Sequence, residues 1–221
     1  MNQIRPSFLF PLLFRDVVFR IPAAEKILYL TFDDGPTPGV TPQVLDILQE
    51  YGAKASFFVC GEKVEKHPDL FHRICSEGHA VGNHTYSHLN GWKTVANSYL
   101  ADVERAQKVV QSNLFRPPYG KLTWRQYRYL RKYYRIVLWD VMCGDYDPAV
   151  TSRSCCERIR RHAIPGSAVV FHDSEKAANK SPDVLEQTLK YFGGKGYRFE
   201  KMNLDSFETV VSPTCQVQKK S

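Results

Sequence analysis

The sequence has no internal repeat, no low-complexity tract beyond its last few residues and no apolar run long enough to cross a bilayer. These absences argue against a disordered, collagenous, repetitive or transmembrane protein. The apolar run FLFPLLF at residues 8–14 contains Pro11, and no small-x-small cleavage site follows it. We interpret it as an arm packed on the domain, with a shallow membrane-surface contact as the alternative. Without an export signal, we expect a cytoplasmic protein.

The six cysteines form no CxxC pair, which argues against a structural zinc knuckle and a thioredoxin-type site. The adjacent Cys155 and Cys156 suit a disulfide framework poorly. We therefore expect most cysteines to be reduced thiols, several of them buried as small hydrophobic side chains. Reduced thiols are typical of a reducing compartment.

Part of the net charge of +7 lies in residues 123–135, where basic and aromatic side chains alternate. On a helix, one stripe would contain four cations: Arg125, Arg128, Lys132 and Arg135. The opposite face would contain Trp124, Tyr127, Leu130 and Tyr134. We interpret this segment as an amphipathic helix with a solvated basic side; a patch that meets an anionic polymer or lipid surface is the alternative. No nucleic-acid-binding motif accompanies it, so we expect no nucleic-acid partner.

From Lys26 onward, β-rich runs alternate with helical patterns about seven times. The strands are expected at residues 26–32, 55–60, 79–84, 114–116, 135–140, 167–172 and 197–199. The helices are expected at about 41–48, with Thr41 as N-cap, and at 70–75, 94–110, 123–135, 151–162 and 183–192. This alternation predicts an α/β fold with parallel strands, in a barrel or a doubly wound sheet. We divide the chain into an N-terminal arm (1–25), one domain (26–202) and a C-terminal tail (203–221).

Unusual polar residues follow many of the predicted strands: Asp33 and Asp34, His84, Arg116, Asp140 and His172. Catalytic groups of a (β/α) barrel come from the carboxyl ends of several strands. Their spread over so many strands favours the barrel over the open sheet.

Asp33 and Asp34 form an acidic pair at the end of an apolar strand. Two adjacent acids are expensive to bury unless a cation or a proton compensates them, although a solvated turn is the simpler alternative. His84 and His88 can point the same way if their segment enters a helical turn, whereas two surface histidines are the alternative. With Asp34 as a third ligand, the histidines would form a His/His/Asp site that leaves a position open for water.

Hydrolysis of an amide at such a site needs a base and an acid besides the metal-bound water, because an amide anion is a very poor leaving group. Asp33, next to Asp34, is the natural base. His172 is the natural acid, since histidine titrates near neutral pH. Arg116 could orient a carboxylate bidentately.

Five sequence blocks resemble, in order, those of the NodB-type polysaccharide deacetylases, the family-four carbohydrate esterases. The blocks are TFDDG at 31–35, H-[ST]-x-x-H at 84–88, R-x-P-Y at 116–119, an acid-plus-aromatic pair at Asp145 and Tyr146, and a hydrophobic-x-His block at 170–172. The resemblance covers about residues 26–199, nearly the whole chain. It implies a distorted (β/α) barrel of about seven strands.

The resemblance also implies a role for each matching residue. Asp34, His84 and His88 resemble the metal ligands, Asp33 the base, His172 the acid, and Arg116 the arginine that orients the base. Asp145 resembles the acid that holds and tunes the catalytic histidine, and the Tyr119 backbone N–H the oxyanion stabiliser. Trp139 fits the extended fourth block, where Asp140 can be purely structural. The family often has Trp where this chain has Tyr146, and usually Leu where it has Val170; both positions resemble pocket walls.

We therefore expect a metal-dependent hydrolase that removes N-acetyl groups from amino sugars of a GlcNAc-type, peptidoglycan- or chitin-like oligomer or polymer. The expected cofactor is one divalent ion, zinc, with cobalt or nickel as alternatives. Three other readings stay open: an O-acetyl esterase, a small-molecule deacylase with the same site, and a non-catalytic glycan-binding protein.

Overall fold

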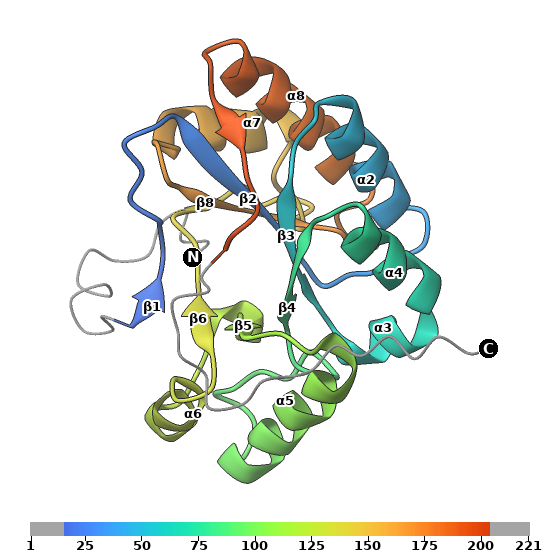
Figure 1. Ribbon diagram of the computed structural model, residues 1–221, viewed down its shortest axis with the longest axis vertical. Coiled ribbons are helices and arrows are strands. Elements are labelled where there is room, and N and C mark those ends of the chain that lie inside the picture. The colour runs from blue at the N-terminus through green and yellow to red at the C-terminus, as the bar shows by residue number, and fades with distance from the viewer. Residues whose placement is uncertain (1–15, 204–221) are drawn as a thin grey trace.

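The computed structural model describes residues 16–203 (Figure 1). The predicted arm up to residue 15, with its apolar run, and the predicted tail from residue 204 onward lie outside the described residues. Within residues 16–203, no helix combines the length and apolarity that crossing a membrane requires.

A curled sheet forms the centre of the molecule. Its strands follow the spatial order β1-β6-β5-β4-β3-β2-β8-β7, with β9 beside β2. Their bounds are Val17–Val18 (β1), Ile27–Asp33 (β2), Ala55–Val59 (β3), Ala80–Asn83 (β4), Leu114–Phe115 (β5), Arg135–Val137 (β6), Val141–Met142 (β7), Ala168–His172 (β8) and Arg198–Phe199 (β9). The ladders between these strands are parallel. This arrangement confirms the predicted α/β class and distorted (β/α) barrel.

The segment 135–142 joins the two edges of the sheet. Its first part, β6, pairs with β5 and β1, and its last part, β7, pairs with β8. Between them, the N–H of Leu138 donates to the Val18 carbonyl and that of Asp140 to the Ala168 carbonyl. The single strand predicted at 135–140 is therefore interrupted, because this stretch leaves one set of neighbours and joins another.

The sheet begins earlier in the chain than Lys26, the predicted start of the domain. Val17 and Val18 pair with β6, and Arg20 forms an antiparallel bridge with Ser167. The side chain of Phe19, between these contacts, is buried. Residues 17–20 are thus part of the sheet, while the outer limits of the predicted domain stay a prediction.

Helices surround the sheet (Figure 1). They are α2 (Thr41–Glu50), α3 (Gly61–Lys66), α4 (Pro68–Ser76), α5 (Ala96–Val110), α6 (Trp124–Leu130), α7 (Ser152–His162) and α8 (Ser181–Gly193), with a short 3-10 turn η1 at Pro118–Gly120. Their apolar faces close the main core; α2, for example, buries Val44, Leu45 and Leu48 against it. The predicted N-cap Thr41 is instead the first residue of α2, and its hydroxyl donates to the Asp173 carboxylate at 2.6 Å.

The basic helix predicted over residues 123–135 is wrong in its extent. Helix α6 begins after a capping box formed by Thr123 and Gln126 and ends at Leu130, and Arg135 already belongs to β6. Four cations therefore do not form one helical stripe. Trp124 was also expected on the apolar face, yet 59% of it is exposed, although Gln126 and Tyr127 in the same part of α6 are buried.

Candidate active site

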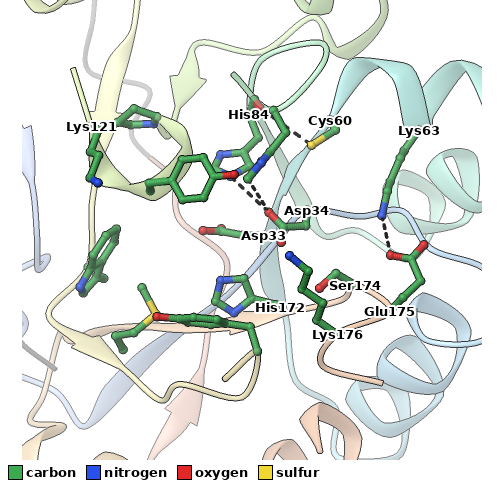
Figure 2. Close-up of a pocket in the computed structure, with 16 residues that line it drawn as sticks. Asp33, Asp34, Cys60, Lys63, His84, Lys121, His172, Ser174, Glu175 and Lys176 are labelled. Atoms are coloured by element: carbon green, nitrogen blue, oxygen red, sulfur yellow. Dashed lines mark hydrogen bonds and ion pairs between the residues drawn. The ribbon is translucent and has the colours of Figure 1, made fainter. Parts of the chain in front are cut away.

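The parallel strands bring the predicted site residues to one end of the barrel. Asp33 ends β2, His84 follows β4, Arg116 follows β5 and His172 ends β8. A pocket of about 610 Å³ opens at this end. Its lining includes Asp33, Asp34, His84, His88 and His172. Figure 2 shows Asp33, Asp34, His84 and His172 around the centre of the pocket.

Three of these side chains can hold a cation together. Nε2 of His88 lies 3.0 Å and Nε2 of His84 lies 3.5 Å from Oδ1 of Asp34. One ligand atom from each residue lies within 4.8 Å of the other two. Burial alone would raise the pKa of Asp34, but hydrogen bonds with the two histidines lower it well below its usual value. An ionised carboxylate and two imidazoles are a donor set that suits zinc.

A hydrogen bond to a backbone carbonyl fixes the orientation of the His84 ring. Its Nδ1 lies 2.6 Å from the carbonyl oxygen of Arg116, which can only accept a hydrogen bond. Nδ1 therefore carries the proton, and Nε2 presents its lone pair to the pocket. His84 is almost fully buried, so its ring cannot turn away into solvent.

The two histidines converge through a loop rather than through a helical turn. Residues 84–90 are non-helical, and Thr85 and His88 adopt left-handed φ values of 64° and 56°. The Asp102 carboxylate of α5 accepts hydrogen bonds from the backbone N–H groups of Tyr86 and Ser87 and from the Ser87 hydroxyl. This carboxylate holds the loop in a shape that the sequence spacing does not reveal.

Asp33 and Asp34 both face the pocket, although neighbouring residues of a regular strand point to opposite faces. Asp34 has a left-handed φ of 78°, which ends the extended strand at this point. The two carboxylates then meet different partners. Asp34 lies beside the histidines, whereas Asp33 lies beside Arg116.

Arg116 is completely buried and has a partner for each of its guanidinium nitrogens. Nη1 donates to Asp33 Oδ1 at 2.6 Å and to the Thr31 hydroxyl at 2.8 Å. Nε and Nη2 donate to the carbonyls of Val137 and Leu138. Burial lowers the pKa of Arg116, but the adjacent Asp33 carboxylate opposes this effect. The pair fixes the position of the Asp33 carboxylate.

His172 lies across the pocket from the two histidines and is supported by the buried Asp145. Nδ1 of His172 lies 2.7 Å from one Asp145 oxygen, and the His172 backbone N–H donates to the other at 2.8 Å. Burial alone would lower the pKa of His172, but the carboxylates of Asp145, Asp34 and Asp33 raise it to about 9. The imidazole can therefore hold a proton at neutral pH.

The predicted wall residues fall into two groups. Tyr119, Trp139 and Tyr146 line the pocket; the Tyr119 ring meets His88 edge-on, and the Tyr146 ring meets His172 in the same way. Val170 is fully buried in β8 and is not part of the lining. Asp140 accepts a hydrogen bond from Ser167 outside the pocket.

Several lining residues were not predicted from the sequence: Cys60, Lys63, Lys121, Met142, Ser174, Glu175 and Lys176. Cys60 directly follows β3, and residues 174–176 follow β8, so the rule of strand ends could have identified them. Lys63 lies on α3, a helix of six residues. Val64 is the buried apolar side chain among residues 61–66, and a single such residue produces no helical periodicity that a sequence could reveal.

Comparisons with known proteins identify relatives of this chain. The sequence profile of the family described as Polysaccharide deacetylase matches residues 20–135. A peptidoglycan-N-acetylglucosamine deacetylase of Bacillus cereus is 34% identical over 193 residues, covering 83% of this chain and 89% of the relative. A chitooligosaccharide deacetylase of Azorhizobium caulinodans is 33% identical, over 70% of this chain and 77% of the relative. The crystal structure of the Bc1960 peptidoglycan N-acetylglucosamine deacetylase superimposes with a TM-score of 0.81 at 31% identity, covering 86% and 92% of the two chains.

Proposed function

Because the chain belongs to the polysaccharide deacetylase family, we propose that it removes N-acetyl groups from the amino sugars of a peptidoglycan- or chitin-like polymer or oligomer. The observation that carries the proposal is the gathering of Asp34, His84 and His88 beside Asp33 and His172 in one pocket. The names of the relatives support the same bond type, since they describe N-deacetylases of peptidoglycan and of chitooligosaccharides.

Asp34, His84 and His88 would hold one divalent cation, for which zinc fits the donor set best. When bound, such a cation supplies Lewis-acid activation of water and of the acyl oxygen. The arrangement of His84, with Nδ1 committed to a backbone carbonyl, fits a ligand whose Nε2 is ready to bind without a change of tautomer.

The remaining residues would move protons and position the substrate. Asp33 accepts the proton of the attacking water, and Arg116 keeps the carboxylate oriented for this task. His172 donates a proton to the leaving amine, since an amide anion leaves too poorly on its own, and Asp145 holds its imidazole. The backbone N–H of Tyr119 would stabilise the oxyanion, while Trp139 and Tyr146 form walls around the sugar.

Acetate release from chitooligosaccharides, with zinc or cobalt added to the purified protein, tests the proposal directly. The Asp33→Asn variant should lose turnover by about 10²–10⁴-fold, because the general base is gone. Its zinc content should stay at the wild-type level, since Asp33 is not among the three ligands. Full activity of this variant would exclude Asp33 as the base, and glycan binding without acetate release by the metal-loaded wild type would contradict the enzymatic function.

The preference between amide and ester substrates can be measured with His172→Ala. An ester needs less help to expel its alcohol than an amide needs to expel its amine, so the loss should be larger on N-acetyl than on O-acetyl substrates. We expect a loss of about 10²–10⁴-fold in kcat on N-acetylated oligomers. An equal loss on both classes, with the wild type faster on O-acetyl xylan, would favour an esterase.

A further inference from the structure

A large aromatic side chain lies exposed beside the pocket, on a loop that follows the metal-ligand loop. Trp92 exposes 65% of its surface, among the highest values for large apolar residues in the described part of the chain. A tryptophan side chain that stays in water does not contribute the favourable free energy that its burial would provide. An exposed tryptophan next to a pocket is therefore a candidate for contact with a ligand.

Trp92 is held rigidly despite its exposure. Its indole N–H donates to the Leu122 carbonyl at 3.0 Å, and its backbone N–H donates to Oδ1 of Asn90 at 3.0 Å. The buried Gln126 side chain donates to the carbonyls of Gly91 and Thr94 on either side of it. The indole thus has a fixed orientation before any ligand arrives, which lowers the entropic cost of binding.

The loop also approaches its neighbouring segment closely. A Cβ atom on Gly91 would lie 2.2 Å from the Lys121 carbonyl oxygen, so only glycine permits this approach. The Trp92 loop and the segment that begins at Lys121 therefore form one packed unit.

Lys121 connects this unit to the pocket. Its side chain lines the pocket, and its Nζ lies over one face of the Trp92 ring, 5.1 Å from the ring centre, in a cation–π contact. Figure 2 shows Lys121 on the opposite side of Asp34 from Lys63. None of the ion pairs between residues 16–203 includes Lys121, so its ammonium donors are available to an incoming group.

We propose that Trp92 and Lys121 form a second sugar subsite, which binds the pyranose unit next to the one that loses its acetyl group. A pyranose presents a face of C–H groups that packs on an aromatic ring, while its hydroxyl and carbonyl oxygens accept hydrogen bonds from an ammonium group. A fixed indole face and a neighbouring cation provide both kinds of contact, and the subsite is continuous with the pocket through Lys121. This inference rests on the proposed function and specifies the substrate as an oligomer or polymer.

The test measures how the rate depends on chain length, with the full chain loaded with zinc. Acetate release is followed for the disaccharide through the pentasaccharide of N-acetylglucosamine. In Trp92→Ala, the ratio of kcat/KM for the pentasaccharide to that for the disaccharide should fall about tenfold, mainly through KM. Trp92→Phe keeps an aromatic face and should retain most of this ratio, whereas Trp92→Leu keeps the bulk alone and should behave like alanine. A length-independent effect, or none, would overturn the subsite.

Tyr133→Ala is the matched control, because Tyr133 is an aromatic residue with half its surface exposed, beyond the far end of α6 and outside the pocket. It should leave the length ratio unchanged. Calorimetric binding of the same oligomers to Asp33→Asn, with and without Trp92→Ala, tests the subsite even if the wild type releases no acetate. A change in oligomeric state without a change in oligomer affinity would instead assign Trp92 to contact between copies of the chain.

Discussion

Arg116 and Asp33 form a buried ion pair in which each guanidinium nitrogen of Arg116 donates to at least one oxygen near the end of a strand. Such a pair contributes little net stability, because two charges have left water. Removal of one partner is different, since it leaves the other charge buried without compensation. The pair is therefore expected to be intolerant of substitution at Arg116, which removes all of these donors at once, and more tolerant of Asp33→Asn, which keeps an oxygen acceptor for Nη1.

Arg116→Met should lower the free energy of unfolding by about 3–5 kcal/mol, because Asp33 and two carbonyls lose their donors at once. Urea denaturation, followed by circular dichroism, measures the effect. Arg125→Met is the control: Arg125 lies exposed on α6, and its loss should change stability by no more than about 0.5 kcal/mol. Equal effects of the two substitutions would contradict the assigned role of the buried pair.

The His172 imidazole offers a prediction on pH. Its pKa of about 9 in the folded chain exceeds the value of 6.5 expected for an unperturbed histidine. The interaction with Asp145 therefore stabilises the fold fully below about pH 6.5, and this contribution is lost as the pH rises through about 9. In metal-free Asp145→Asn, burial dominates, and the His172 pKa should fall to 6.5 or below. Titration of the histidine ring by NMR measures the shift; an unchanged titration would refute the assignment.

At the scale of the elements, the loop of residues 84–88 depends on a helix that contributes no ligand. Asp102 of α5 accepts three hydrogen bonds from this loop. The strand ends were accessible to sequence reasoning, because polar residues after apolar runs mark them: Asp33, His84, Arg116 and His172. The loop conformation could not be predicted, because it depends on residues with left-handed φ values and on a carboxylate of the following helix, 15–16 residues further along the chain.

Asp102→Ala should weaken zinc binding about 10–100-fold, although Asp102 does not touch the ion, because the two histidines lose their fixed spacing. Competition with a chromophoric chelator measures the affinity. Glu104→Ala, which removes an exposed carboxylate on the same helix, should leave the zinc affinity unchanged. Zinc affinity that stays the same in Asp102→Ala would mean that the loop holds its shape without α5.

At the scale of the whole molecule, the sheet is closed by contacts that periodicity does not reveal. The β/α alternation gave most strands and helices within a few residues, since each buries a regular apolar pattern. Strand β1 escaped prediction because two residues carry no period, and the 135–142 segment looked like one strand although it pairs with different neighbours at its two ends. These short pieces link the edges through tertiary hydrogen bonds.

A chain that begins at Lys26 should be less stable than one that begins at Asp16. It lacks β1, the bridge of Arg20 to Ser167 and the buried Phe19 side chain, whose burial alone is worth about 1.5–3 kcal/mol. Thermal denaturation of the two shortened chains measures the difference, expected at about 4–10 °C in Tm. Equal Tm values would show that the sheet closes without residues 17–20.

The shared use of the Arg116 guanidinium has a practical consequence for capturing a substrate complex. Its nitrogens donate hydrogen bonds both to the proposed base, Asp33, and to the carbonyls of residues 137 and 138. Loss of this side chain should therefore impair catalysis and the closure of the barrel together. In a mutational scan, substitutions at position 116 should be rare among soluble clones, because they impair folding and not only turnover. Crystallisation trials with trapped glycan are better based on Asp33→Asn, whose amide oxygen still offers the guanidinium an acceptor.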